Sequence, residues 1–150
     1  MAKKIAKAKS PAKPTKVEKA SVTTMKCAKI CQPIGPYRMG KIIRQPGVGT
    51  WGYSSGCCGF NKKAELVSKK PGAQAKKAMQ NLQACATSNG FKMSDAIKTT
   101  VFLTDMSHFA EVNVEYAKFF KNDAPARSCV AVHQLPKGAL FEVEAVFFKA

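Results

Sequence analysis

The chain has 150 residues, of which 45% are hydrophobic, and it carries a formal net charge of +16 at pH 7. This length suits one domain with a sizeable core. No apolar run approaches the roughly 18 residues that a membrane-spanning helix needs, and the start lacks a secretory apolar segment. We therefore expect the six cysteines to be reduced, and their spacing does not match the usual zinc motifs.

The first 26 residues form a basic arm with eight lysines and one glutamate, a net charge of +7. Its Lys, Ala, Pro, Ser and Thr cannot bury enough apolar surface to offset the entropy of ordering, so disorder is predicted over 1–26. The arm could be a solubilising tail, an organelle presequence or a nucleic-acid contact. A cytoplasmic location is expected, with mitochondrial or nuclear targeting through the arm as the alternatives.

A single domain is predicted over residues 27–150. It begins with an extended segment near 31–37, because two prolines and a glycine disfavour a helix there. A short strand around 42–43, a turn over 45–49 and a second strand over 50–58 follow. The polar residues 62–70 are expected to form a loop.

The next elements are helices and strands that alternate. Pro71 suits the first turn of a helix, and Gly90 suits its left-handed C-terminal cap. The β-branched residues 96–104 predict a strand, after which Asp105 or Ser107 can cap a second helix. Its buried stripe is expected to contain four large apolar side chains, those of Phe109, Val112, Tyr116 and Phe119.

Two final strands are predicted over 127–134 and 140–148, and we expect them to pair as a hairpin. The element order β-β-β-α-β-α-β-β then indicates an α+β fold with two helices on one face of a mixed sheet. In the last strand, both alternating faces carry large apolar side chains. One sheet face would stay uncovered in a two-layer domain, so self-association is expected.

Arg127 and Glu142 are the first candidates for chemistry. Only three of the 25 basic residues are arginines, and Arg127 lies in a strand-like segment where a planar fork could grip a carboxylate. Glu142 could position or activate a water molecule. The alternative is an ion pair between Arg127 and Glu142 or Glu144, and spacing alone does not choose between these interpretations.

Other catalytic patterns are weak. His108 and His133 have no Ser or Cys partner in a recognisable motif, which disfavours a catalytic triad. The phosphate-binding pattern G-x-x-x-x-G-K-[ST] does not occur in the sequence. The aromatic residues Trp51, Tyr53 and Phe60 are more typical of a core than of a base-stacking platform.

Several segments resemble the RidA/YjgF family of enamine/imine deaminases. The most specific is the Ala-Arg-Ser-Cys-Val run at 126–130, followed by the strand that contains Glu142. Similar segments occur at 34–37, 98–106, 109–113, 116–120, 135–138 and 141–145. The resemblance covers about residues 31–149.

That resemblance implies a chorismate-mutase-like fold and a homotrimer with a central barrel and clefts between subunits. It implies hydrolysis of 2-aminoacrylate (2-iminopropanoate) or 2-iminobutanoate to 2-keto acids and ammonia, without a metal or organic cofactor. By this resemblance, Arg127 would grip the substrate carboxylate, Glu142 would hold the attacking water, and the Cys129 main chain would bond the substrate. Tyr37 would line the cleft, and Asn113 would help to shape the subunit contact.

The sequence departs from the family pattern at four places. Cys57 stands where a glutamine is usual, Arg38 and Met39 replace a common small-Gln pair, the hairpin around 44–48 looks longer, and His133 replaces a small residue. These positions lie near the cleft in the family, so the substrate range stays open. Two rival hypotheses are a basic RNA-binding or RNA-cleaving protein of the same fold and a non-catalytic trimeric scaffold.

Overall fold

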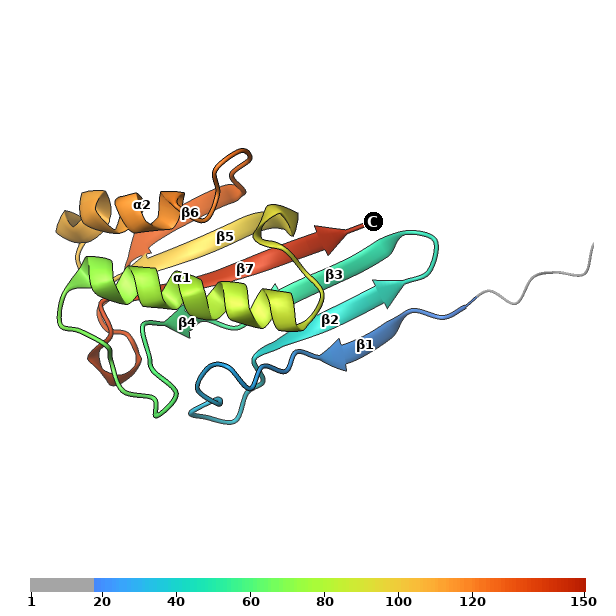
Figure 1. Cartoon of the computed structure of the whole chain (residues 1–150), viewed down its shortest axis with the longest axis horizontal. Helices are drawn as coiled ribbons and strands as arrows, with labels where there is room; N and C mark the ends of the chain where they lie inside the picture. Colours follow the sequence, from blue (N-terminus) through green and yellow to red (C-terminus); the bar gives the residue numbers. More distant parts are fainter. Residues whose placement is uncertain (1–17) are drawn as a thin grey trace, which may run out of the picture.

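The computed structural model describes residues 18–150, and it contains one mixed sheet with two helices packed on one face (Figure 1). Along the sheet the strands follow the order β1-β2-β3-β7-β5-β6, and β4 pairs with β7 beside β3. All pairs are antiparallel except β5 and β6. The strands are β1 (Ser21–Thr24), β2 (Gly40–Gln45), β3 (Gly49–Ser54), β4 (Cys57–Cys58), β5 (Ala96–Leu103), β6 (Ala126–Ala131) and β7 (Phe141–Lys149).

Helix α1 (Pro71–Ser88) confirms the predicted first helix. Pro71 occupies the first turn, and Gly90 adopts the left-handed conformation with φ of 85° just past the C-terminus. The side chains of Ala75, Ala78, Met79 and Leu82 are fully buried against the sheet. Helix α2 (Phe109–Ala117) confirms the second, with Val112 and Tyr116 buried and Phe109 more exposed than the predicted stripe required.

The core lies between the helices and β7. Phe141, Val143, Ala145 and Phe147 alternate along β7 and are all buried on the helix side. The predicted alternation of this strand is therefore confirmed, and it places Glu142 and Glu144 on the opposite face.

The predicted disorder of residues 1–26 is wrong for the last part of this segment, because Ser21–Thr24 form strand β1 on the edge of the sheet. Val22 pairs in register with Ile43 of β2, and the following Met25 is only 2% exposed. The β-branched Val-Thr-Thr run favours a strand, and Met25 anchors it in the core. Residues 1–17 of the predicted segment lie outside the described residues.

The predicted hairpin of the last two strands is also wrong, because β5 lies between β6 and β7. Helix α2 connects β5 to β6, which lie side by side in parallel, as a crossover connection requires. Strand β7 instead takes a central position between β3 and β5. Its apolar residues on both faces suit that position better than an edge.

The predicted strand over 50–58 is divided by a bend at Ser55 and Gly56, which separates β3 from β4. The hydroxyl of Ser54 accepts a hydrogen bond from the Ala145 amide of β7 at 2.9 Å, where ladder pairing is interrupted. The bend brings β4 alongside the first residues of β7, and Cys58 pairs with Glu142.

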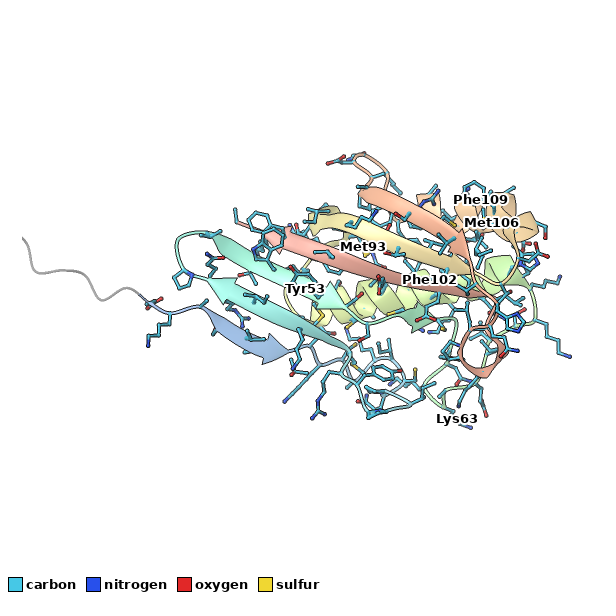
Figure 2. All side chains as sticks on the ribbon, turned by 180° about the vertical axis from the view of Figure 1, so that it is seen from behind. Tyr53, Lys63, Met93, Phe102, Met106 and Phe109 are labelled. Carbon is cyan, nitrogen blue, oxygen red and sulfur yellow. The ribbon has the colours of Figure 1, made fainter. Side chains whose placement is uncertain are left out.

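Within residues 18–150, the sheet face away from the helices has no covering layer, and Figure 2 shows this face with Tyr53 and Phe102 labelled. One register row across this face contains Val22, Ile43, Trp51 and Phe148, and the Trp51 and Phe148 rings lie 4.7 Å apart. This apolar row agrees with the expectation of an uncovered face. Within residues 18–150, no helix has the length and apolar character of a bilayer span.

Candidate active site

A cavity of about 480 Å³ lies beside β4 and contains Glu142 in its wall. Its lining comes from the loop over 30–39, the bend over 54–58, Asn81 and Cys85 of α1, and Glu142 and Glu144 of β7. The volume falls within the range of about 300–1,000 Å³ that is typical of small-molecule sites. The cavity is therefore large enough to hold a small substrate next to a carboxylate.

The Glu142 carboxylate is partly desolvated, and this burial raises its pKa above the ordinary value of 4.5. A hydrogen bond from the Cys58 thiol lowers the pKa of Glu142, whereas the negative charge of Glu144 raises it. A carboxylate with a raised pKa in a cavity is suited to take a proton from water and return it later.

Gly56 leaves the space that the Glu142 carboxyl group occupies. A Cβ atom at position 56 would lie 2.6 Å from Cδ of Glu142 and closer still to Oε1. We expect Gly56→Ala to displace the carboxylate by about 1 Å and to lower kcat about a hundredfold, with little change in melting temperature. Steady-state kinetics and thermal unfolding measure both quantities. An additional large loss from Gly56→Ala in a Glu142→Gln background would contradict this explanation.

The pH dependence of the reaction should report on Glu142. Since a base must be ionised, kcat/KM should fall as the pH decreases through the raised pKa of Glu142, at a pH above 4.5. A pH–rate profile measures this acidic limb, and Glu144→Gln should shift it to lower pH, because the charge of Glu144 raises the pKa of Glu142. A limb that stays in place in Glu144→Gln would contradict the assignment.

The same shift affects stability with a defined sign. Because the folded-state pKa of Glu142 is raised, its stabilising effect is fully present below about pH 4.5 and is lost as the pH rises through the raised value. Glu142→Gln, which carries no charge, should therefore melt at a higher temperature than the native protein at pH 8. This difference should shrink below pH 4.5 in thermal unfolding experiments, and a constant difference would contradict the linkage.

Tyr37 lies at the mouth of the cavity and is 46% exposed. Its hydroxyl accepts a hydrogen bond from the Ile34 amide at 3.4 Å, and its ring lies over Gly35. These contacts fold the loop back on itself and present the ring at the opening. The structure thus brings Tyr37 and Glu142 together in one cavity.

Arg127 belongs to a second cluster, between β6 and α2. Its Nη1 donates a hydrogen bond to Oδ1 of Asn113 at 2.7 Å, and its guanidinium carbon lies 4.6 Å from the ring centroid of Tyr116. The hydroxyls of Tyr116 and Thr99 are 2.8 Å apart in the core, which fixes the ring. Asn113 is uncharged, so its hydrogen bond does not neutralise the Arg127 guanidinium. The other N–H groups of the guanidinium can still bind an anion.

Cys129 lies two residues after Arg127, on the same side of β6, and its side chain packs against the core. Burial raises the pKa of the Cys129 thiol, and the nearby Arg127 charge only partly offsets this effect. The thiol is therefore neutral near pH 7 and a poor nucleophile. Arg127, Asn113 and Cys129 form one cluster, and Tyr37 and Glu142 form another.

Within one chain, Arg127 and Glu142 do not meet. Arg127 pairs in register with Thr99 of β5, which pairs with Ala145 of β7, three residues from Glu142. At a strand spacing of about 4.8 Å and a rise of about 3.3 Å per residue, their Cα atoms are roughly 14 Å apart. Their side chains also lie on opposite faces of the sheet, since Arg127 contacts α2 and Glu142 alternates with helix-facing residues.

The ion pair that the sequence left open is therefore not formed. The salt bridge found within residues 18–150 joins Lys118 to Glu115, at 2.6 Å. In the same part of the chain no group of three or more His, Cys, Asp and Glu side chains is arranged to hold a metal ion.

Sequence reasoning missed three residues that shape the two clusters. Gly56 leaves the space that the Glu142 carboxyl group occupies, and the ring of Tyr116 packs against the Arg127 guanidinium. Asn81 donates hydrogen bonds to the carbonyls of Cys58 and Phe60 at 3.0 and 2.9 Å. The sequence analysis placed Tyr116 in the buried stripe of the second helix, and nothing in the sequence indicated a role for its hydroxyl. A buried asparagine on the apolar face of a predicted helix was the available signal for Asn81.

Comparison with known proteins identifies the family of this chain. The family model described as "Endoribonuclease L-PSP" matches residues 28–148. The chain belongs to the RidA/YjgF family. A 2-iminobutanoate/2-iminopropanoate deaminase of Salmonella typhimurium is 39% identical over 114 residues, which are 74% of this chain and 89% of that protein.

Solved structures of RidA/YjgF proteins share the fold. The YjgF gene product of Escherichia coli has a TM-score of 0.75 and 34% identity, covering 85% of this chain and 99% of its own. RidA from an Antarctic Psychrobacter has a TM-score of 0.76 and 31% identity, with the same coverage. Other relatives of this RidA/YjgF protein, at 35–38% identity, are named only as RutC family proteins. The expected α+β fold and family are thus confirmed.

Proposed function

We infer that this RidA/YjgF protein hydrolyses 2-imino acids, among them 2-iminopropanoate (the tautomer of 2-aminoacrylate) and 2-iminobutanoate, to 2-keto acids and ammonia. The observation that carries this inference is the partly desolvated Glu142 carboxylate in the wall of a small-molecule cavity. Relatives at 39–40% identity named as deaminases of these imines support the substrate class.

Glu142 can carry the proton transfers of this reaction. Its carboxylate accepts a proton from water as the water oxygen bonds to the imine carbon, and it passes this proton to the imine nitrogen, which gives a carbinolamine. Glu142 then accepts the proton of the carbinolamine hydroxyl, which becomes the keto oxygen, and donates it to the departing nitrogen. Ammonia leaves, and the carboxylate is regenerated in each cycle.

Arg127 would hold the substrate carboxylate through two N–H groups, while Asn113 and Tyr116 keep the guanidinium in place. Because Arg127 and Glu142 lie apart on opposite sheet faces, a second copy must bring its Arg127 to the first copy's cavity. Strand β6, which carries Arg127 and Cys129, is at the edge of the sheet. The proposed assembly is a homotrimer with three such sites, in which the uncovered sheet faces form the centre.

The direct test generates 2-iminopropanoate from D-alanine with D-amino-acid oxidase and traps the free imine with semicarbazide. The protein should lower the yield of trapped imine and accelerate ammonia release in proportion to its concentration. If the purified protein leaves both rates at the buffer value, the deaminase function is refuted.

Binding of single-stranded RNA is a second candidate function, favoured by the basic surface. Residues 18–150 hold 19 Lys and Arg against 9 Asp and Glu, a net charge of +10. Four lysines, Lys62, Lys63, Lys69 and Lys70, lie in the loop between β4 and α1. Replacing all four with glutamine should reduce the slope of log affinity against log salt by about 3. If the native protein binds no RNA, or if the salt slope is unchanged in this variant, this surface is excluded as an RNA site.

A further inference from the structure

We propose that Cys58 is a positioning residue of the deamination reaction, and that the hydrogen bond from its thiol holds the Glu142 carboxylate in the ionised and oriented form that activates water. The inference rests on the proposed deaminase function and deepens it. It gives a task in the reaction to a cysteine that does not act as a nucleophile.

Cys58 and Glu142 are direct cross-strand neighbours. Strand β4 runs antiparallel to β7, with Cys58 opposite Glu142 and Cys57 opposite Val143. Opposed residues of an antiparallel pair place their side chains on the same face of the sheet, with Cβ atoms about 4.5–5.5 Å apart. Cys57 therefore points to the helix side, where it packs against the core, and Cys58 points to the side of Glu142. Both Cys58 and Glu142 line the cavity.

The backbone of β4 is fixed around Cys58. The buried Asn81 amide donates hydrogen bonds to the carbonyls of Cys58 and Phe60, at 3.0 and 2.9 Å. Gly59 lies so close to α1 that a Cβ atom at this position would be 2.7 Å from Cα of Gln74. The Cys58 residue is only 6% exposed, so its side chain has little freedom and the thiol is held beside the carboxylate.

No cation competes with Cys58 for the Glu142 carboxylate in the part of the chain that the structure describes. Within residues 18–150 Glu142 forms no salt bridge, and the cavity lining includes no Lys or Arg. On β5 the residue opposite Glu142 is Phe102, which does not titrate. The titratable side chains that line the cavity with Glu142 are those of Cys31, Tyr37, Cys57, Cys58, Cys85 and Glu144.

The Cys58 thiol remains a donor throughout the reaction. Burial, together with the nearby charge of Glu142, raises the pKa of this thiol well above its ordinary value of 9.0, so the sulfur keeps its proton near neutral pH. An S–H group is a weak donor, but a low local dielectric strengthens its bond to a half-buried carboxylate. Burial raises the pKa of Glu142, and this bond, which favours the ionised form, partly offsets the rise.

Removing the donor should favour the protonated form of Glu142. Cys58→Ala should therefore raise the pKa of Glu142 and move the acidic limb of kcat/KM to higher pH, opposite to the effect of Glu144→Gln. Relative to its value at pH 8, kcat/KM on the acidic limb should fall about three- to tenfold, because a thiol bond is at the weak end of hydrogen bonds to charged groups.

The experiment compares Cys58→Ala with Cys58→Ser, which are similar in size but differ in the hydroxyl donor. Profiles of kcat/KM against pH are measured with oxidase-generated 2-iminopropanoate. The carboxyl carbons of ¹³C-labelled glutamates are also titrated by NMR, where the Glu142 signal is the one that Glu142→Gln lacks, and this measurement needs no catalysis. Cys27→Ala is the control, because Cys27 is a buried thiol that donates to the Ala84 carbonyl at 3.5 Å and does not line the cavity.

Both measurements should show a raised pKa of Glu142 in Cys58→Ala, a pKa at or below the native value in Cys58→Ser, and no change in Cys27→Ala. An unchanged pKa in Cys58→Ala, or an equal rise in Cys58→Ser or Cys27→Ala, would overturn the inference. If Cys58→Ala lacks a cooperative melting transition, Cys58→Val, which also has no donor, takes its place, and a raised pKa in Cys58→Ser alone still overturns the inference. If the native protein hydrolyses no imine, the proposed function fails, whereas the NMR titration still decides whether Cys58 holds Glu142 in its ionised form.

Discussion

The Arg127→Ala variant is expected to lose about a thousandfold in kcat/KM for 2-iminopropanoate, because it removes the cation that holds the substrate carboxylate. Arg127→Lys should recover only a small part, since an ammonium group lacks the planar fork that Asn113 and Tyr116 orient. Steady-state kinetics with the oxidase-coupled imine supply measures both variants.

The matched control is Arg44→Ala. Arg44 is an exposed arginine on β2, whose Nη1 hydrogen-bonds the Thr23 hydroxyl at 3.4 Å, and it lines neither cluster. Its loss should change kcat/KM less than threefold. Near-native activity in Arg127→Ala would show that another group binds the carboxylate.

Glu142→Gln should lower kcat by about 10²–10⁴-fold, the range typical of removing a general base, and it keeps the shape of the side chain. Since the amide cannot accept a proton from water, the effect should fall on kcat more than on the affinity for the product keto acid. Single-turnover measurements and keto-acid calorimetry separate these two quantities.

Glu144→Gln is the matched control for Glu142, because both residues lie on the same face of β7 and both line the cavity. Glu144 should contribute little to proton transfer directly, so Glu144→Gln should lower kcat less than about tenfold at pH 8. Equal losses in the two variants would mean that the carboxylates act through their charge rather than through one base.

The sequence predicted the helices and the last strand well because each has a strong local pattern. Pro71 and Gly90 define α1, and the alternation of Phe141, Val143, Ala145 and Phe147 defines the buried face of β7. Such patterns depend only on residues that are close in the sequence, so they can be recognised before the fold is known.

Pairing between distant strands was harder to predict. The last two strands looked like a hairpin because they are close in the chain, but β5 separates them. Likewise, Ser21–Thr24 lie in a lysine-rich segment whose composition predicted disorder, and the structure pairs them with β2. Both errors arise because tertiary contacts, rather than composition or proximity in sequence, determine strand partners.

The site residues followed from the family resemblance, and the structure adds where they lie. Spacing alone allowed Arg127 and Glu142 to neutralise each other, whereas the register places them on opposite faces of the sheet. No sequence pattern within one chain could show that Tyr37 and Glu142 share one cavity while Arg127, Asn113 and Cys129 form a separate cluster.

The central claim, that one copy supplies Glu142 and another supplies Arg127, is tested most directly by mixing two inactive variants. Arg127→Ala and Glu142→Gln subunits are co-refolded in equal amounts. In a cyclic trimer every mixed assembly then contains one complete site, so random mixing should restore about a quarter of native activity. A mixture that stays as inactive as its two components would contradict the claim.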